Sequence, residues 1–157
     1  MTKPHDVADV VDRTASVENI INQVIVAFCE PQDSFGFFWN VILDSSVMPL
    51  GSKVKVVSAI AHEVKFKLSR DAIHTVLALR NAFAHHPLNS HQVVVVAKNP
   101  DENHVFSQLQ VLKGSGKIER MGREHAHAEF ESSFKIAKES LVGLLAAIKD
   151  LRAPSDA

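Results

Sequence analysis

The chain has 157 residues, of which 46% are hydrophobic and 22% charged, and its formal net charge is −1 at pH 7. This length fits one domain with its own core, and this apolar content excludes wholesale disorder. The near-neutral charge excludes a protein that coats nucleic acid without specificity, although the segment 53–70 is locally basic.

The cysteine content and the lack of a recognisable signal peptide predict a reducing compartment. Cys29 is the only cysteine, so no intrachain disulfide can form, and its apolar surroundings predict a buried, unreactive thiol. Residues 1–10 lack the apolar core of a signal peptide. The longest apolar run, 141–148, is far shorter than the roughly 20 residues that span a bilayer. We therefore expect a soluble, cytoplasmic protein without a membrane partner.

The first two elements are predicted to be helices. Apolar residues at helical spacing run from about Val7 to Phe28, and Pro31 should end that helix. Asp33 or Ser34 can cap a second helix over the following aromatic segment. We expect its apolar stripe to pack in the core, while some aromatic side chains could instead cover a partner. The residues of this stripe are Phe35, Phe38, Trp39, Ile42 and Leu43.

Two more helices follow the break at Pro49 and Gly51. Ser52 can cap a helix that runs to about Leu68, and Ser69 or Arg70 begins the next, which Pro87 should end. In the first of them the lysines are expected largely outside the buried stripe, on a solvated face. The stripe is Val57, Ile60, Ala61, Val64 and Leu68, and the lysines are Lys53, Lys55, Lys65 and Lys67.

The pattern changes after Pro87. Residues 91–97 and 104–112 have strand-like patterns, with turns at 99–102 and 114–116 and a short piece at 117–121. A last helix is expected from about Glu124, followed by a frayed tail at 152–157. The sequence thus predicts a mainly α fold in a single domain, 1–157. It is a helical bundle with a small antiparallel β-hairpin or meander, about 91–121, inserted before the last helix.

One helix end concentrates chemically useful side chains. At about 100° per residue, Arg80 falls within the apolar arc of its helix, beside a stripe that contains Asn81 and His85. The guanidinium could form a structural ion pair with a carboxylate of another helix, or it could bind a phosphate. His85 could cap the helix, or its ring could accept and donate a proton. The residues alone leave both alternatives open.

The motif Arg80-Asn81-x-x-x-His85 resembles the signature of HEPN domains, helical domains of RNA-cleaving toxins, prokaryotic defence proteins and their inactive relatives. The resemblance covers about residues 16–150. It implies a homodimer in which two motifs face one cleft, with metal-independent endoribonuclease activity. His85 would act as general base or acid, Arg80 would stabilise charge on the phosphate, and Asn81 would orient His85 or the substrate. His74, His86, Lys53 and Lys55 are additional candidates for substrate binding.

The same segment, residues 80–85 with the sequence Arg-Asn-x-Phe-Ala-His, also resembles mannitol operon repressor proteins. This implies an alternative: a non-catalytic module for transcriptional regulation or protein interaction, in which residues 37–39 or the hairpin contact a protein partner. A subtype of the first hypothesis is a toxin that is neutralised by a cognate nucleotidyltransferase antitoxin.

No metal site or cofactor is expected from the sequence. Nine histidines invite a metal interpretation, but His85 and His86 are adjacent and cannot both reach one ion from a regular helix. No Cys, Asp or Glu completes a standard zinc spacing, and His125 and His127 are expected in a polar loop or a first turn. Gly114-Ser115-Gly116 lacks the context of a phosphate-binding loop and is interpreted as a turn.

Overall fold

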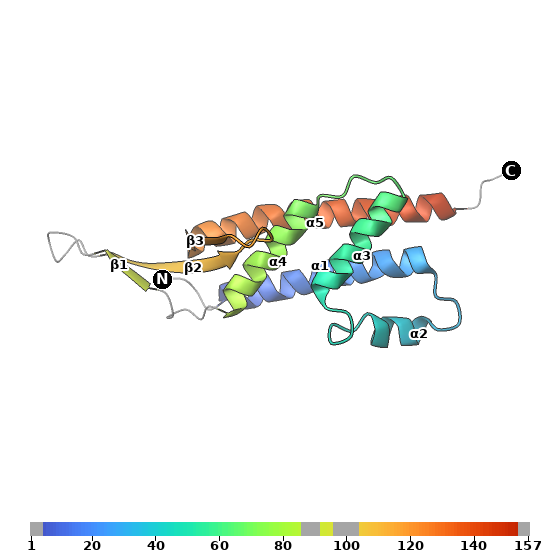
Figure 1. Cartoon of the computed structure of the whole chain (residues 1–157), viewed down its shortest axis with the longest axis horizontal. Helices are drawn as coiled ribbons and strands as arrows, with labels where there is room; N and C mark the ends of the chain where they lie inside the picture. Colours follow the sequence, from blue (N-terminus) through green and yellow to red (C-terminus); the bar gives the residue numbers. More distant parts are fainter. Residues whose placement is uncertain (1–4, 86–91, 96–103, 154–157) are drawn as a thin grey trace. The chain divides into compact units, whose positions relative to one another are not determined.

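The protein is represented by a computed structural model that describes residues 5–85, 92–95 and 104–153. The predicted fold class is confirmed: the chain is mainly helical, with a small antiparallel sheet before the last helix (Figure 1). The elements in chain order are α1 (His5–Cys29), α2 (Phe35–Phe37), the π-helical turn η1 (Phe38–Ile42), α3 (Leu50–Glu63), α4 (Arg70–His85), β1 (Gln92–Val95), β2 (His104–Leu112), β3 (Ile118–Gly122) and α5 (Arg123–Arg152).

The sheet is an antiparallel meander with β2 in the middle. The first half of β2 pairs with β1, from Gln92 opposite Ser107 to Val95 opposite His104. Its second half pairs with β3, from Gln108 opposite Gly122 to Leu112 opposite Ile118. The predicted turn at 99–102 and residues 91, 96 and 97 of the predicted first strand lie outside the described residues.

The chain divides into two compact units, and the long helices α1 and α5 contribute to both. The first unit contains residues 1–14 and 71–134, hence α4 and the sheet; the second contains residues 15–70 and 135–157, hence α2, η1 and α3. Each has its own buried apolar residues. Those of the first are Val10, Ile73, Val76, Leu79, Ala82, Phe83, Leu109, Val111, Ala126, Phe130 and Phe134; those of the second include Val17, Ile21, Val24, Leu43, Val57, Ile60, Leu141, Leu144 and Ile148.

The end of α3 differs from the prediction. The helix stops at Glu63 instead of running to about Leu68, because Lys65 adopts a left-handed conformation with φ of 55°. The amide of Phe66 donates to the carbonyl of Ala61 at 2.8 Å, and that of Lys65 to the carbonyl of His62 at 3.1 Å. These two bonds form a Schellman motif, which ordinarily has glycine at the position of Lys65.

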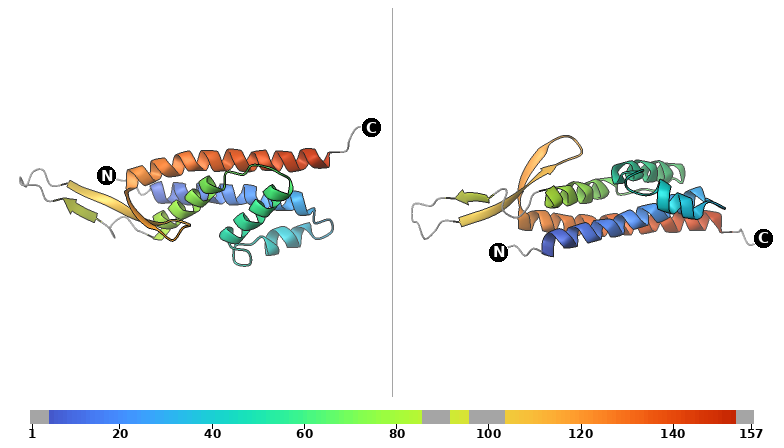
Figure 2. Two further views of the ribbon diagram at one scale, coloured as in Figure 1. Left: turned by 45° about the horizontal axis from the view of Figure 1, so that its top comes forward. Right: turned by 90° about the horizontal axis from the view of Figure 1, so that it is seen from below.

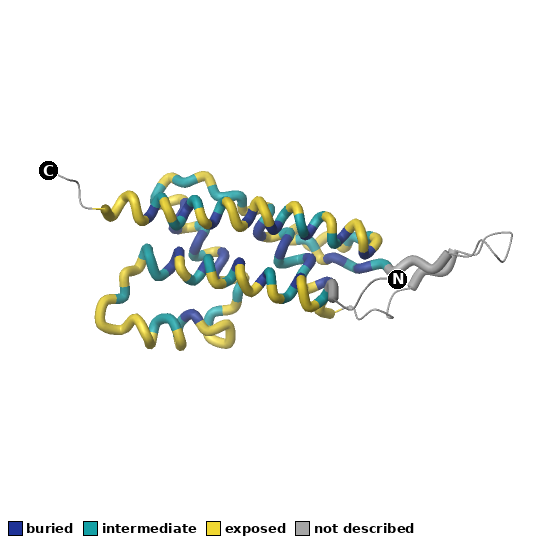
Figure 3. The backbone as a smooth tube through the Cα atoms, turned by 180° about the vertical axis from the view of Figure 1, so that it is seen from behind, coloured by how far each residue is buried: buried dark blue, intermediate teal, exposed yellow. Residues whose placement is uncertain are grey.

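The expectation that residues 35–43 pack in the core is wrong for most of the segment. It forms one short α-helical turn and a π-helical turn, in which no residue is buried. Leu43 is buried, whereas Phe35 and Phe37 are 52% and 60% exposed. The tube between α1 and α3 is accordingly coloured mostly as exposed (Figure 3).

Two end assignments also need correction. Cys29, expected to be buried, is exposed because it lies at the last position of α1. Arg152, assigned to a frayed tail, belongs to α5: its guanidinium pairs with Glu30 and donates to the carbonyl of Phe28. Among the described helices, none combines the length and the apolar character needed to cross a membrane.

Candidate functional site

Helix α4 fixes the orientation of the predicted site residues within the first unit. It buries one face, made of Ile73, Val76, Leu79, Ala82 and Phe83. Its last described residue is His85, and the stop predicted at Pro87 lies outside the described residues. Phe83 anchors the last turn. Its ring lies edge-on to His127 at 6.3 Å between centroids, and the guanidinium carbon of Arg123 lies 4.9 Å from its centre. This packing holds the opposite side of the last turn toward solvent.

Arg80 lies half-buried at the edge of that face. Its Nη1 donates a hydrogen bond to Oδ1 of the neighbouring Asn81 at 3.1 Å. Among residues 5–85, 92–95 and 104–153, no carboxylate forms an ion pair with Arg80. The structural ion pair that the sequence left open is therefore not found in this part of the chain. As far as the described residues show, Asn81 occupies one of the five guanidinium N–H donors, and the others can bind an anion.

Asn81 and His85 are exposed and one helical turn apart, so both side chains belong to the same face of α4. Asn81 accepts the hydrogen bond from Arg80 and lies on the same helix face as His85. This places a cation, an amide and a titratable ring at one helix end. The arrangement can bind a phosphate and transfer a proton.

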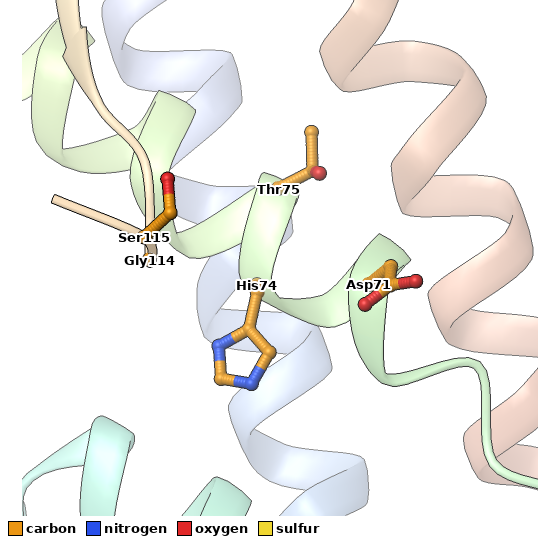
Figure 4. A pocket seen from close by; sticks show the side chains of 5 residues that line it. All are labelled: Asp71, His74, Thr75, Gly114 and Ser115. Carbon is orange, nitrogen blue, oxygen red and sulfur yellow. The ribbon is translucent and has the colours of Figure 1, made fainter. Parts of the chain in front are cut away.

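A pocket of about 400 Å³ lies further back along α4. Asp71, His74 and Thr75 of α4 line it together with Gly114 and Ser115 of the β2–β3 turn (Figure 4). The turn is closed by a hydrogen bond from the amide of Gly116 to the carbonyl of Lys113 at 2.9 Å, with Gly116 left-handed at φ of 83°. Figure 2 shows this hairpin beside α4. His74, which was predicted to bind substrate, is therefore an exposed pocket residue seven positions before Asn81.

The predicted lysines differ in their surroundings. Lys55 is exposed on α3, as expected. Lys53 is not part of a solvated face: it is completely buried in the second unit, where its Nζ pairs with Oε1 of Glu18 at 2.5 Å. An ammonium held there is committed to Glu18, so Lys53 is removed from the substrate-binding candidates. His86 lies outside the described residues.

The structure also assembles a cluster that the sequence did not reveal. Asp9 of α1 meets His127 and Glu131 of α5, and one ligand atom from each lies within 4.8 Å of the others. His125 lies in the first turn of α5, as expected, whereas His127 begins the second turn. The spacing of His127 and Glu131, i and i+4 on one helix, is a signal of proximity that the sequence contains. Asp9, however, is 118 positions away from His127, and no local pattern connects the two.

Comparison with known proteins adds no relative to this description. No protein-family model matches the chain, and neither does any curated protein or solved structure.

Proposed function

We propose that the chain is a dimeric, metal-independent endoribonuclease of the HEPN type, with Arg80, Asn81 and His85 at its catalytic centre. The observation that carries this proposal is the state of Arg80. Its guanidinium is hydrogen bonded to the neutral amide of Asn81, one turn before the exposed His85, and, within the described residues, to no carboxylate. A half-buried arginine without a structural counter-ion is suited to an anionic ligand, and its fork of donors matches a phosphate.

The reaction uses the 2′-hydroxyl of the RNA as an internal nucleophile. His85 removes the proton of this hydroxyl as its oxygen bonds to phosphorus, or its protonated ring donates to the 5′-oxygen as the P–O bond breaks. The products are a 2′,3′-cyclic phosphate and a 5′-hydroxyl, so no water or metal ion enters the cleavage step. Arg80 stabilises the charge that builds up on the phosphate oxygens, and Asn81 orients the guanidinium or the substrate. DNA lacks the nucleophile and should not be cleaved.

The test is cleavage of end-labelled RNA in excess chelator by the wild type and by His85→Ala. His62→Ala is the matched control, because His62 is also exposed and lies in the last turn of its helix, α3. We expect the wild type and His62→Ala to give a 2′,3′-cyclic phosphate end, and His85→Ala to give none. A 2′-deoxy substitution at the cleaved position should block the reaction. Cleavage that persists in His85→Ala would contradict the proposal.

The dimer belongs to the same proposal, because two motifs that face one cleft double the positive charge offered to a polyanion. Its direct test is the mass of the protein in sedimentation equilibrium, where a value twice that of one chain is expected. A cognate nucleotidyltransferase antitoxin would be a natural partner if the nuclease is a toxin. In that case its addition should abolish RNA cleavage.

One observation favours the alternative of a non-catalytic regulatory or interaction module related to the mannitol operon repressor. Phe35 and Phe37 are more than half exposed, and the Phe35 ring stacks on Trp39 with 6.1 Å between centroids. Exposed aromatic residues of this kind are typical of protein-binding surfaces. Intact RNA in every arm of the cleavage assay would favour this alternative over the nuclease.

A further inference from the structure

Three side chains from two helices converge in the first unit, and none of them is a residue of the proposed nuclease centre. Nε2 of His127 lies 3.7 Å from Oδ2 of Asp9 and 3.9 Å from Oε1 of Glu131. His127 and Glu131 are one turn apart on α5, and Asp9 comes from α1. All three are partly accessible, with side-chain exposures of 31%, 42% and 47% for His127, Glu131 and Asp9. An ion from solvent can therefore reach them.

We propose that Asp9, His127 and Glu131 form a binding site for a divalent first-row transition metal such as Zn²⁺. One imidazole nitrogen with two carboxylates is a ligand set for Zn²⁺ or Co²⁺, whereas Ca²⁺ and Mg²⁺ prefer oxygen ligands alone. With bonds of about 2.1 Å, neighbouring ligands of a tetrahedral ion are about 3.4 Å apart. The two spacings to His127 are close to this value, so small side-chain rotations complete the site, and water fills the remaining position.

Arg13 is the competitor that sets the affinity of this site. Its Nη1 pairs with Glu131, and it lies 3.5 Å from Oδ2 of Asp9. Its guanidinium carbon also lies 4.4 Å from the centre of the Phe134 ring and 5.9 Å from that of Phe130. The guanidinium thus has an aromatic surface on which to stay when a divalent ion takes over the two carboxylates. The exchange replaces one positive charge by two beside a pair of negative charges.

The metal would link α1 to α5 within the first unit. Because it binds the folded arrangement of three side chains from distant parts of the sequence, it should stabilise the folded state by mass action. It would also fix the His127 ring, whose edge-on contact supports Phe83 in the last turn of α4. The site is therefore structural in this proposal, and it takes no part in RNA cleavage.

The experiment is titration of tag-free protein with ZnCl₂ by calorimetry, supported by the visible absorption of Co²⁺ as a probe of nitrogen–oxygen coordination. We expect one high-affinity ion per chain, and loss of this binding in His127→Ala and in Glu131→Gln. His125→Ala is the matched control, an exposed histidine two residues away on the same helix, and it should bind like the wild type. Arg13→Met should tighten binding by about tenfold or more, since it removes a competing positive charge.

Thermal unfolding gives a second readout that does not depend on any activity. Zn²⁺ should raise the Tm of the wild type and of His125→Ala, and leave that of His127→Ala unchanged. Glu131→Gln serves the same purpose if His127→Ala fails to fold. The proposal is overturned if neither the wild type nor Arg13→Met binds Zn²⁺, or if binding survives both ligand substitutions. Chelator removes this metal without affecting the proposed cleavage, so the two proposals can fail separately.

Discussion

Arg80 is the residue on which the nuclease proposal can be tested most directly. It contributes a hydrogen bond to its neighbour Asn81 and, within the described residues, no ion pair, so its removal should leave the fold intact. We expect Arg80→Ala to lower the rate of RNA cleavage by on the order of 10²–10³, the usual effect of removing a group that stabilises transition-state charge. Arg80→Lys should restore little, since an ammonium lacks the bidentate fork.

The control for this measurement is Arg120→Ala, because Arg120 is an exposed arginine of β3 in the same unit. It should keep the wild-type rate, and both variants should keep the wild-type Tm within about 2 °C. Equal losses of activity in the two variants would show that net positive charge, and not the position of Arg80, is what RNA cleavage requires.

Single residues were predicted well only where the decisive partner was close in sequence. The stripe that Asn81 and His85 share beside the apolar face follows from the phase of α4, which its own apolar residues define, and both are exposed. The burial of Lys53 depends on Glu18, 35 positions earlier, although its spacing of four from Val57 placed it on the buried stripe. The cluster around His127 depends on Asp9, which no local pattern connects to α5. Long-range partners of charged groups are the part that sequence patterns do not contain.

Elements were predicted by their breakers more reliably than by their caps. The proline at position 31 marks the end of α1 correctly, because the ring blocks helix continuation whatever the surroundings. The end of α3 was missed because Lys65 takes a left-handed conformation that sequence rules reserve for glycine or asparagine. The burial of residues 35–43 was mispredicted for another reason: the helical spacing of aromatic side chains does not show whether another element covers them.

The β2–β3 hairpin carries an ionic cluster that should make it sensitive to acid. The Lys117 and Lys113 ammonium groups, at 3.3 and 3.4 Å, lower the pKa of Glu119 below its ordinary value of 4.5. Burial opposes the charged form of Lys113, but its bonds to Glu129 and Glu119 outweigh this and raise the pKa of Lys113 above 10.5. The contribution of Glu119 to the free energy of unfolding is thus fully present above pH 4.5. It is lost as the pH falls through the lowered pKa of Glu119 in the folded state. The contribution of Lys113 to the free energy of unfolding is fully present below pH 10.5, and it is lost as the pH rises through the raised pKa of Lys113.

This prediction is checked by ¹³C NMR titration of the Glu119 carboxyl. We expect a midpoint below 4.5 in the wild type and a return toward 4.5 when Lys113→Met and Lys117→Met are combined. Lys149→Met, which removes an exposed lysine of the second unit, should leave the midpoint unchanged. A wild-type midpoint at 4.5 would mean that the lysines do not interact with Glu119 in solution.

For the whole molecule, the sharing of α1 and α5 predicts that the two units unfold together. Because α1 and α5 each run through both units, unfolding of one unit would break two helices that continue in the other. We expect hydrogen exchange of α3 amides, in the second unit, and of α4 amides, in the first, to approach the same opening free energy as urea increases. Separate plateaus that differ by more than about 1 kcal/mol would show two independently stable units.

The continuity of the two long helices also limits how the gene can change. In α5 the buried positions run without a break in phase through the unit boundary, from Phe130 and Phe134 to Ala137 and Leu141. An inserted or deleted codon near position 135 would turn every later side chain by about 100° and expose the apolar stripe of the second unit. Substitutions at the outward positions of these helices are therefore tolerable, whereas insertion or deletion of a single residue within them is not.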